Sequence, residues 1–335
     1  MKPVIFGLSG LTLTHDERDF FRDSDPLGYI LFKRNCADRE QMRALTDSVR
    51  ALSGRDDVPI LIDQEGGRVA RMQPPEWPAF PAGEAFDALY EVAPVSAIEA
   101  ARANAHALGL MLAEVGVNVD CLPLLDVRRP ETSNIIGDRS LGSEPMRVAA
   151  MGKAVIEGLR RAGVVGVVKH MPGHGRALVD SHLELPRVSA SAAELETDIE
   201  PFATLKDAPM GMTCHVVFEA WDRDRPATLS PTVIGDVVRG RIGFDGLLMT
   251  DDIDMKALSG TAGDKAEAGL AAGCDVVLDC WARMEEMTEI AGRLGDAPPE
   301  TLARLDRAMA TVAAPRDEAD FAELIAKRDA LLALV

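Results

Sequence analysis

Asp180 and His182 have the residue types and the spacing that proton transfer requires. In an extended loop, side chains two positions apart point to the same side, so the Asp180 carboxylate can accept the Nδ1–H of the imidazole and leave Nε2 free. Such an imidazole can act as a general acid or base near neutral pH. The competing interpretation is a hydrogen bond that only stabilises the loop. The polar residues expected around His182 favour a catalytic role.

Asp251 ends an apolar run, 246–251, in which an ionised carboxylate would be costly if it faced the core without partners. We therefore expect Asp251 to face a pocket. Asp252 should point to the opposite side of the strand, and Asp254 is placed to cap the next helix, which we expect to begin at Met255. Capping or metal binding by this acidic cluster is the alternative.

Lys169 and His170 close another apolar run, so one of them should project into the same pocket. A lysine here could form a Schiff base if its pKa were depressed, but close carboxylates such as Asp251 would raise that pKa instead. Hydrogen bonding to substrate hydroxyls is the favoured role. His170 and His174 have a spacing seen in zinc sites, but Pro172 between them prevents the helix that would bring both rings to one face, so the metal signal is weak.

Asp63, Arg71 and Arg139 combine one carboxylate with two guanidinium groups. Together they can recognise a polar, hydroxyl-rich or partly anionic ligand. Surface salt bridges are the alternative interpretation. Taken alone, these residues indicate a hydrolase or lyase that acts on a polar small molecule.

The elements that must position these residues are short apolar runs of strand length. Eight such runs occur, at 3–8, 28–33, 58–63, 117–122, 164–169, 210–215, 246–251 and 275–280. Their nearly continuous hydrophobicity is typical of parallel strands buried on both faces. Eight strand and helix units within 335 residues predict one (β/α)8 barrel of the TIM type, an α/β fold that forms a single catalytic domain over 1–335. An open doubly wound sheet is the competitor, but no glycine-rich nucleotide motif follows an early strand. Residues that follow the strands of a barrel share one face, which should hold the chemistry.

Other segments fit around this barrel. Residues 97–116 and 146–163 have the apolar stripe and the terminal glycine of helices that pack outside a sheet. The proline-rich segment 73–83 predicts a rigid wall or lid beside the pocket. Residues 172–188 have no helical pattern and predict a loop that can carry groups into the site, and 317–335 predicts an amphipathic closing helix that could also serve a partner.

Composition limits the possible partners and location. The formal net charge of −18 argues against binding to nucleic acid or to an anionic membrane surface. The five cysteines form no C-x-x-C pair, so neither a disulfide framework nor a zinc knuckle is expected. Without a secretory signal or an apolar run long enough for a membrane span, the sequence predicts a soluble cytoplasmic protein of undetermined oligomeric state.

Three motifs carry a family resemblance. They are K-H-x-P-G-H-G-x-x-x-x-D-S-H at 169–182, I-D-Q-E-G-G-R-V-x-R at 62–71, and T-D-D-x-x-M at 250–255. The chain resembles the bacterial β-N-acetylhexosaminidases of glycoside hydrolase family 3, the single-domain enzymes of peptidoglycan recycling. The resemblance covers nearly the whole chain in family order. Met171 stands where the family commonly has an aromatic residue, and Asp254 where it often has a serine.

The resemblance implies a role for each candidate residue. It implies Asp251 as the nucleophile, His182 as the general acid/base and Asp180 as the partner of that histidine. It implies binding of substrate by Asp63, Arg71, Arg139, Lys169 and His170. The implied reaction is hydrolysis, with retention of configuration, of terminal non-reducing β-linked N-acetylglucosamine from muropeptides or chitooligosaccharides, without cofactor or metal. An unperturbed histidine pKa near ~6.5 suits the proton-transfer role.

Three alternatives stay open at the level of sequence. A phosphorylase would use the same site, with phosphate instead of water resolving the glycosyl-enzyme. A metal-dependent barrel hydrolase would use Asp63, His170, His182 and Asp251 as ligands. A sugar-binding or scaffold protein without turnover is the third, and the intact proton-transfer pair argues against it.

Overall fold

Eight parallel strands form a closed barrel in the computed structural model, which describes residues 1–181, 183–314 and 317–335. Around the barrel the order is β1-β10-β9-β7-β5-β4-β3-β2. Each barrel strand therefore lies beside the barrel strands that come before and after it in the chain, and the last strand, β10, closes the barrel against β1. Their bounds are β1 Lys2–Gly7, β2 Pro26–Leu31, β3 Ile60–Ile62, β4 Val119–Asp120, β5 Val165–Met171, β7 Met210–Thr213, β9 Leu247–Asp252 and β10 Val276–Asp279. Each lies within or overlaps one of the eight predicted runs, and the predicted (β/α)8 barrel is confirmed.

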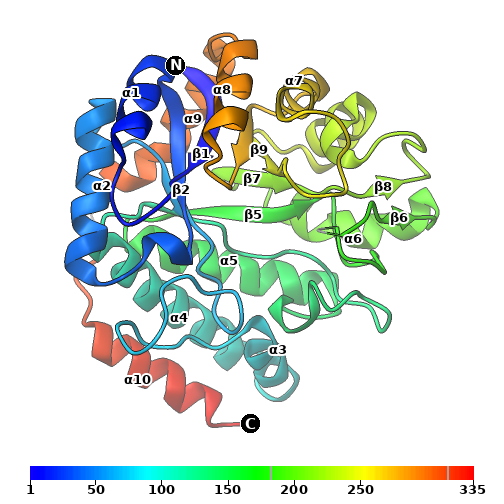
Figure 1. Ribbon diagram of the computed structural model, residues 1–335. Helices are drawn as coiled ribbons and strands as arrows, with labels where there is room; N and C mark the ends of the chain where they lie inside the picture. Colours follow the sequence, from blue (N-terminus) through cyan, green and yellow to red (C-terminus); the bar gives the residue numbers. More distant parts are fainter. Residues whose placement is uncertain (182, 315–316) are drawn as a thin grey trace.

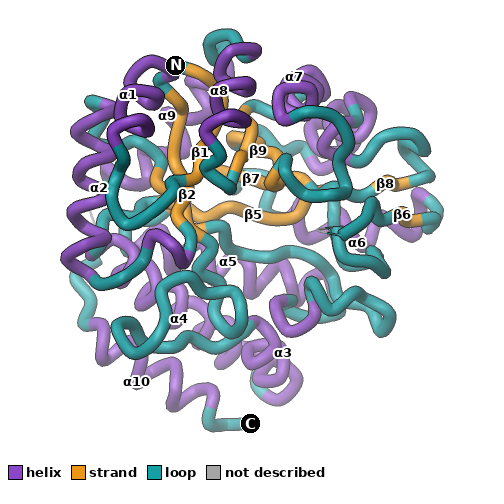
Figure 2. The backbone as a smooth tube through the Cα atoms, viewed as in Figure 1, coloured by secondary structure: helices purple, strands orange, loops and turns teal. Residues whose placement is uncertain are grey.

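Helices surround the strands on the outside of the barrel, as Figures 1 and 2 show. The α-helices are α1 His15–Ser24, α2 Arg39–Ser53, α3 Gly83–Val92, α4 Pro94–Glu114, α5 Pro145–Arg161, α6 Ala192–Thr204, α7 Ala262–Ala272, α8 Met284–Arg293, α9 Pro299–Ala313 and α10 Phe321–Leu332. A π-helix covers Val233–Ile242, and short 3-10 turns cover Lys33–Asn35, Gly137–Arg139 and Ala227–Leu229. Helices α1, α6 and α7 each begin with a capping box, in which a Ser or Thr before the helix exchanges hydrogen bonds with the third helical residue. These bonds satisfy N–H groups of the first turn that have no partner within the helix.

The strands separate two apolar layers, which explains their continuous hydrophobicity. One cluster fills the barrel interior and includes Leu61, Val167, Met249 and Leu278. The other lies between strands and helices and includes their immediate chain neighbours, for example Ile62, Val168, Leu248 and Val277. Successive side chains on a strand point to opposite faces, so each strand contributes to both layers.

Two local predictions from the sequence are wrong. No helix begins at Met255: the segment after β9 is a series of turns, and α7 begins only at Ala262 with Thr261 as its cap. Asp254 therefore caps no helix, and its carboxylate pairs with Arg283 instead. A small parallel sheet of β6 (Arg187–Val188) and β8 (Val217–Phe218) was also not predicted. Two-residue strands are too short to produce a pattern.

The proline-rich segment forms no helix before α3 and packs against the loop that follows β3. The N–H of Gly67 donates to the carbonyl of Phe80 at 2.8 Å. At Gly66, which has φ +102°, a Cβ atom would lie 2.2 Å from the carbonyl oxygen of Pro81. Only glycine permits so close an approach with this backbone conformation. The segment is therefore a wall behind the residues at the end of β3.

The predicted C-terminal helix is α10, which packs on α4 and α3 at the edge of the molecule (Figure 1). Lys327 pairs with Glu99, and Arg328 donates to Asn104 at 3.2 Å. Among the described helices, none has the length and apolar character needed to cross a membrane.

Candidate active site

Three predicted site residues lie at one mouth of the barrel. Asp63, Lys169 and Asp251 each lie two positions beyond a side chain of the interior cluster, at the carboxyl end of β3, β5 and β9. Side chains two positions apart on a regular strand share a face, which places Asp63 and Lys169 on the interior side, where they contact each other. The register between β9 and β10 shifts between Met249 and Asp252, so this rule does not orient Asp251, but its carboxylate acts on the pKa of both His174 and Cys280. The carboxyl ends of parallel strands meet at one end of a barrel, where TIM-barrel chemistry occurs.

An ion-pair network connects the ends of β3 and β5. Asp63 accepts from Arg71 Nη2 at 2.9 Å and from Lys169 Nζ at 3.2 Å. The Nζ of Lys169 also lies 2.6 Å from an oxygen of Glu65. Glu65 accepts two further bonds from Arg139, both at 2.8 Å. Four of the five predicted substrate-binding residues are thus in one connected cluster.

This network fixes the charge of its members. Burial alone would raise the pKa of Asp63, but Lys169 and then Arg71 hold it well below its usual range. Burial is likewise outweighed at Glu65, whose pKa is lowered to about 2 by Arg139 and Lys169. For Lys169, burial would lower the pKa, and Glu65 and Asp63 raise it. The lysine is therefore an ammonium at neutral pH, which excludes the free amine needed for a Schiff base. The predicted rise in its pKa is confirmed, although the carboxylates responsible are Asp63 and Glu65.

His170, the fifth predicted binding residue, is organised by Asp126 in the loop after β4. Its Nδ1 lies 2.7 Å from Oδ2 of Asp126, and because a carboxylate only accepts, Nδ1 is the protonated nitrogen. The other oxygen, Oδ1, accepts from the backbone N–H groups of His170 at 3.2 Å and His174 at 2.6 Å. Burial alone would raise the pKa of Asp126, but its contacts with His170 and His174 lower it to about 2.

His174 is buried beside this pair and stays neutral. Its ring centroid lies 5.8 Å from that of His170, and its Nε2 lies 3.2 Å from Oγ of Ser181. Burial lowers the pKa of His174 to about 4, against opposing influences from Asp126 and Asp251. The two histidines are thus arranged around one carboxylate rather than around a shared metal position.

Asp251 is half-buried on β9, between β7 and β10 in the barrel. Its Oδ1 accepts the N–H of Asp252 at 2.8 Å. Asp252 pairs in register with Leu278 of β10, and Met249 pairs with Met212 of β7, which is itself in register with β5. Asp251 and the Lys169–His170 pair therefore lie at the same end of the barrel, as the sequence predicts.

The predicted acid/base pair is only partly described. His182 lies outside the described residues. Asp180 is half-buried, and its carbonyl accepts from the N–H groups of Leu183 at 2.9 Å and Glu184 at 3.1 Å. The predicted pairing of Asp180 with His182 stays a prediction, because one of its two members is outside the described residues.

Comparisons with known proteins identify the family of this chain. The model of the glycosyl hydrolase family 3 N-terminal domain matches residues 9–314. The chain belongs to glycosyl hydrolase family 3. Two relatives named β-hexosaminidase support this: one from Alkalilimnicola ehrlichii is 38% identical over 91% of this chain and 88% of its own, and one from Chromobacterium violaceum is 39% identical over 91% and 86%. The predicted enzyme class, a β-N-acetylhexosaminidase of this family, is confirmed.

Solved structures of a family 3 relative have the same fold. NagZ from Neisseria gonorrhoeae, crystallised with N-trifluoroacetyl-D-glucosamine, gives a TM-score of 0.86 at 28% identity and covers 99% of this chain and 98% of its own. A structure of the same relative in complex with zinc ion gives a TM-score of 0.85 at 27% identity, over 99% and 98%.

Two residues of the candidate site were not assigned a role from the sequence. Glu65 is the carboxylate that joins Lys169 to Arg139, and Asp126 orients His170. Glu65 lies two positions after Asp63, and Asp126 follows a predicted strand. Their position after strands of the barrel could therefore have identified both as candidate site residues. Their partners are 74 and 44 residues away in the chain, which a single sequence does not reveal.

Metal binding by the predicted ligand set has no support in the described part of the chain. Within 1–181, 183–314 and 317–335, no group of three or more His, Cys, Asp or Glu side chains is arranged to hold a metal ion. Asp63 is engaged by Arg71 and Lys169, and His170 by Asp126.

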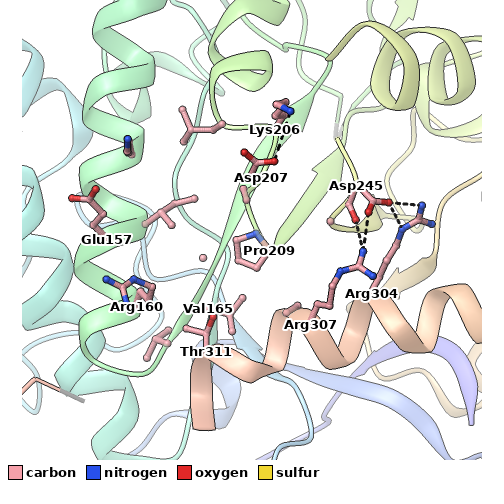
Figure 3. Close-up of a pocket in the computed structure, with 18 of the residues that line it drawn as sticks. Glu157, Arg160, Val165, Lys206, Asp207, Pro209, Asp245, Arg304, Arg307 and Thr311 are labelled. Carbon is pink, nitrogen blue, oxygen red and sulfur yellow. Dashed lines mark hydrogen bonds and ion pairs between the residues drawn. The ribbon is translucent and has the colours of Figure 1, made fainter. Parts of the chain in front are cut away.

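A large cavity lies at the opposite end of the family 3 barrel. It has a volume of about 610 Å³ and is lined by residues that precede β5, β7 and β9 and by helices α5 and α9. Figure 3 shows Arg304 and Arg307 on one side, joined to Asp245, and Lys206 with Asp207 on another. None of the described site residues lines it, so the cavity is separate from the candidate active site.

Proposed function

We propose that the protein is a retaining exo-β-N-acetylglucosaminidase that hydrolyses terminal non-reducing β-linked N-acetylglucosamine from peptidoglycan (muropeptide) fragments or chitooligosaccharides. The observation that carries the proposal is the position of Asp251 at the barrel mouth, at the carboxyl end of β9 and at the same end as the Lys169 network. The barrel with its helices, residues 1–335, acts as one catalytic domain in this proposal.

Asp251 is the nucleophile in this mechanism. Its carboxylate attacks the anomeric carbon, the glycosidic bond breaks, and a covalent glycosyl-enzyme forms. His182 donates a proton to the leaving oxygen and then removes one from the attacking water, and Asp180 orients and stabilises the imidazolium. Retaining glycosidases usually use a second carboxyl group for this proton transfer. A histidine can perform it at neutral pH because its ordinary pKa is near ~6.5.

The charged network supports recognition of the sugar. Asp63 stays ionised beside Lys169 and Arg71, so its carboxylate can accept hydrogen bonds from sugar hydroxyls. Lys169 and Arg71 can donate to hydroxyl oxygens, and Arg139 holds Glu65 so that the lysine is anchored. His170 presents a tautomer set by Asp126. An amino-sugar derivative bound to the Neisseria relative supports the proposed ligand class.

Substitution of the nucleophile tests the proposal. D251A should abolish release of nitrophenol from 4-nitrophenyl N-acetyl-β-D-glucosaminide while the circular dichroism spectrum stays unchanged. D138N, a change in the exposed pair with Arg68, is the control and should keep wild-type turnover. Undiminished turnover by D251A would refute the assignment.

Two additions to the same assay separate the alternatives. A phosphorylase would form sugar 1-phosphate when phosphate is added, whereas the proposed hydrolase releases free N-acetylglucosamine. A metal-dependent hydrolase would lose activity in the presence of a chelator, and the proposed mechanism predicts no loss.

Release of N-acetylglucosamine from purified muropeptides tests the substrate class. We also propose a cytoplasmic location, because all five cysteines are free thiols and disulfides are rare in that compartment. Cell fractionation tests the location.

A further inference from the structure

Trp281 stands at the rim of the barrel mouth, two residues beyond the end of β10. It follows Cys280, whose side chain belongs to the interior cluster, and β10 is the direct neighbour of β9, which carries Asp251. The indole is 54% exposed, and it is the one aromatic ring among the exposed large apolar side chains of the described residues. In a chain with only 4% aromatic residues, an exposed indole beside the candidate site needs an explanation.

The indole is held in place although it is exposed. Its Nε1–H donates to Oδ2 of Asp252 at 3.1 Å. The other oxygen of Asp252 accepts the backbone N–H groups of Asp254 at 3.2 Å and Cys280 at 3.3 Å. Asp252 itself donates its N–H to Asp251. One carboxylate therefore connects the indole edge to the strand that carries the proposed nucleophile.

The backbone beyond the indole is also unusual. Ala282 has φ +55°, a left-handed conformation that side chains other than glycine rarely adopt. Residues in such sparsely populated backbone conformations cluster at functional sites. It turns the chain directly after Trp281 and before Arg283, which pairs with Asp254 and Glu286.

The faces of this indole are available to a ligand. No aromatic ring or guanidinium group stacks on Trp281 among the residues that the structure describes. Its polar edge is satisfied by Asp252, and its apolar faces remain half-exposed. A rigid aromatic ring with a bonded edge provides contact area at little entropic cost. The ligand that fits such a surface at the mouth of a glycosidase is the apolar face of a pyranose ring.

We propose that Trp281 is the platform of an aglycone subsite, on which the sugar ring next to the cleaved bond stacks. This inference rests on the proposed function, because the subsite receives the part of the substrate that leaves. Trp281 then determines how strongly an extended sugar chain binds, and it has no part in the chemistry at Asp251.

Two substrates of different length test the subsite. One is the β-linked disaccharide of N-acetylglucosamine, which has a sugar aglycone, and the other is N-acetyl-β-glucosaminyl fluoride, which has none. W281A should raise KM for the disaccharide about tenfold, equivalent to about 1.4 kcal/mol of binding, and leave kcat/KM for the fluoride within twofold of wild type. W281F keeps an aromatic face but loses the bond to Asp252, and it should keep the disaccharide KM within about threefold. V95A, a change at an exposed apolar residue on α4, is the control and should alter neither substrate.

Each other result has a definite meaning. An equal loss on both substrates in W281A would overturn the subsite, because it would show that Trp281 acts by positioning Asp251 through Asp252. No change on either substrate would also overturn it. As a second measurement, a thio-linked, uncleaved disaccharide should change the tryptophan fluorescence of the wild type but not of W281F, and an equal response of both proteins would contradict the stacking. If the wild type fails to cleave the fluoride at all, the proposed function is wrong rather than the subsite.

Discussion

Glu65 and Arg139, 74 residues apart in the chain, form a two-bonded ion pair at the barrel mouth, with both N–O distances at 2.8 Å. Because Glu65 also contacts Nζ of Lys169, this carboxylate joins the loop after β4 to the ends of β3 and β5. Both partners are largely buried, so neither charge can be satisfied by water if the other is removed.

E65Q tests this relationship. The substitution leaves Arg139 and Lys169 as buried cations with one fewer carboxylate, and we expect the free energy of unfolding to fall by about 3 to 5 kcal/mol. Urea denaturation measures the loss. D138N breaks an exposed ion pair with Arg68 and should cost less than about 1 kcal/mol. Equal losses in the two variants would mean that the buried pair has no special role.

The fold was largely predictable because each strand is buried on both faces, and continuous apolar runs reveal such strands without knowledge of their partners. The positions of Asp63, Lys169 and Asp251 at one end of the barrel follow from the same pattern, since each comes at the end of an apolar run. The partners of these residues were not predictable: Glu65 and Asp126 act across long chain separations. The prediction that Asp254 caps a helix is wrong because turns replace the expected helix, and Asp254 pairs with Arg283.

Acid should weaken the fold through Glu65. The pKa of this carboxyl is about 2 in the folded protein against an ordinary value of 4.5, so its contribution is present above about pH 4.5 and is lost as the pH falls toward 2. The shift corresponds to about 3 kcal/mol. Urea denaturation at a series of pH values should show a smaller acid-induced fall in E65Q than in the wild type. Identical pH profiles would contradict the lowered pKa.

Asp279 should have the opposite pH dependence. Burial, followed by repulsion from Asp252 and Glu286, raises its pKa from 3.8 to about 7, and its Oδ2 has no hydrogen-bond partner among the described residues. A carboxyl with a raised pKa stabilises the fold at low pH, and this stabilisation is lost as the pH rises through about 7. D279N should therefore raise Tm relative to wild type more at pH 8 than at pH 5. The same Tm difference at both pH values would show that Asp279 does not titrate in this range.

D126N should reduce activity by weakening the control of His170. The charged acceptor at Nδ1 is lost, and a buried hydrogen bond to a charged group is worth about 1.5 to 3 kcal/mol, so we expect kcat/KM to fall about 10- to 100-fold. Steady-state kinetics on the nitrophenyl substrate measure this fall. D222N, which changes a carboxylate bonded to Ser230 beyond the β7 end, is the control and should keep most of the activity. A wild-type kcat/KM for D126N would contradict the proposed role of His170 in substrate binding.

The most direct test of the account is mass spectrometry of the protein after inactivation by a fluorinated N-acetylglucosaminyl compound that traps the glycosyl-enzyme. We expect one sugar per chain, attached to the peptide of β9 at Asp251. A label on Asp252, Asp63 or any other side chain, or turnover of the compound without a trapped sugar, would contradict it.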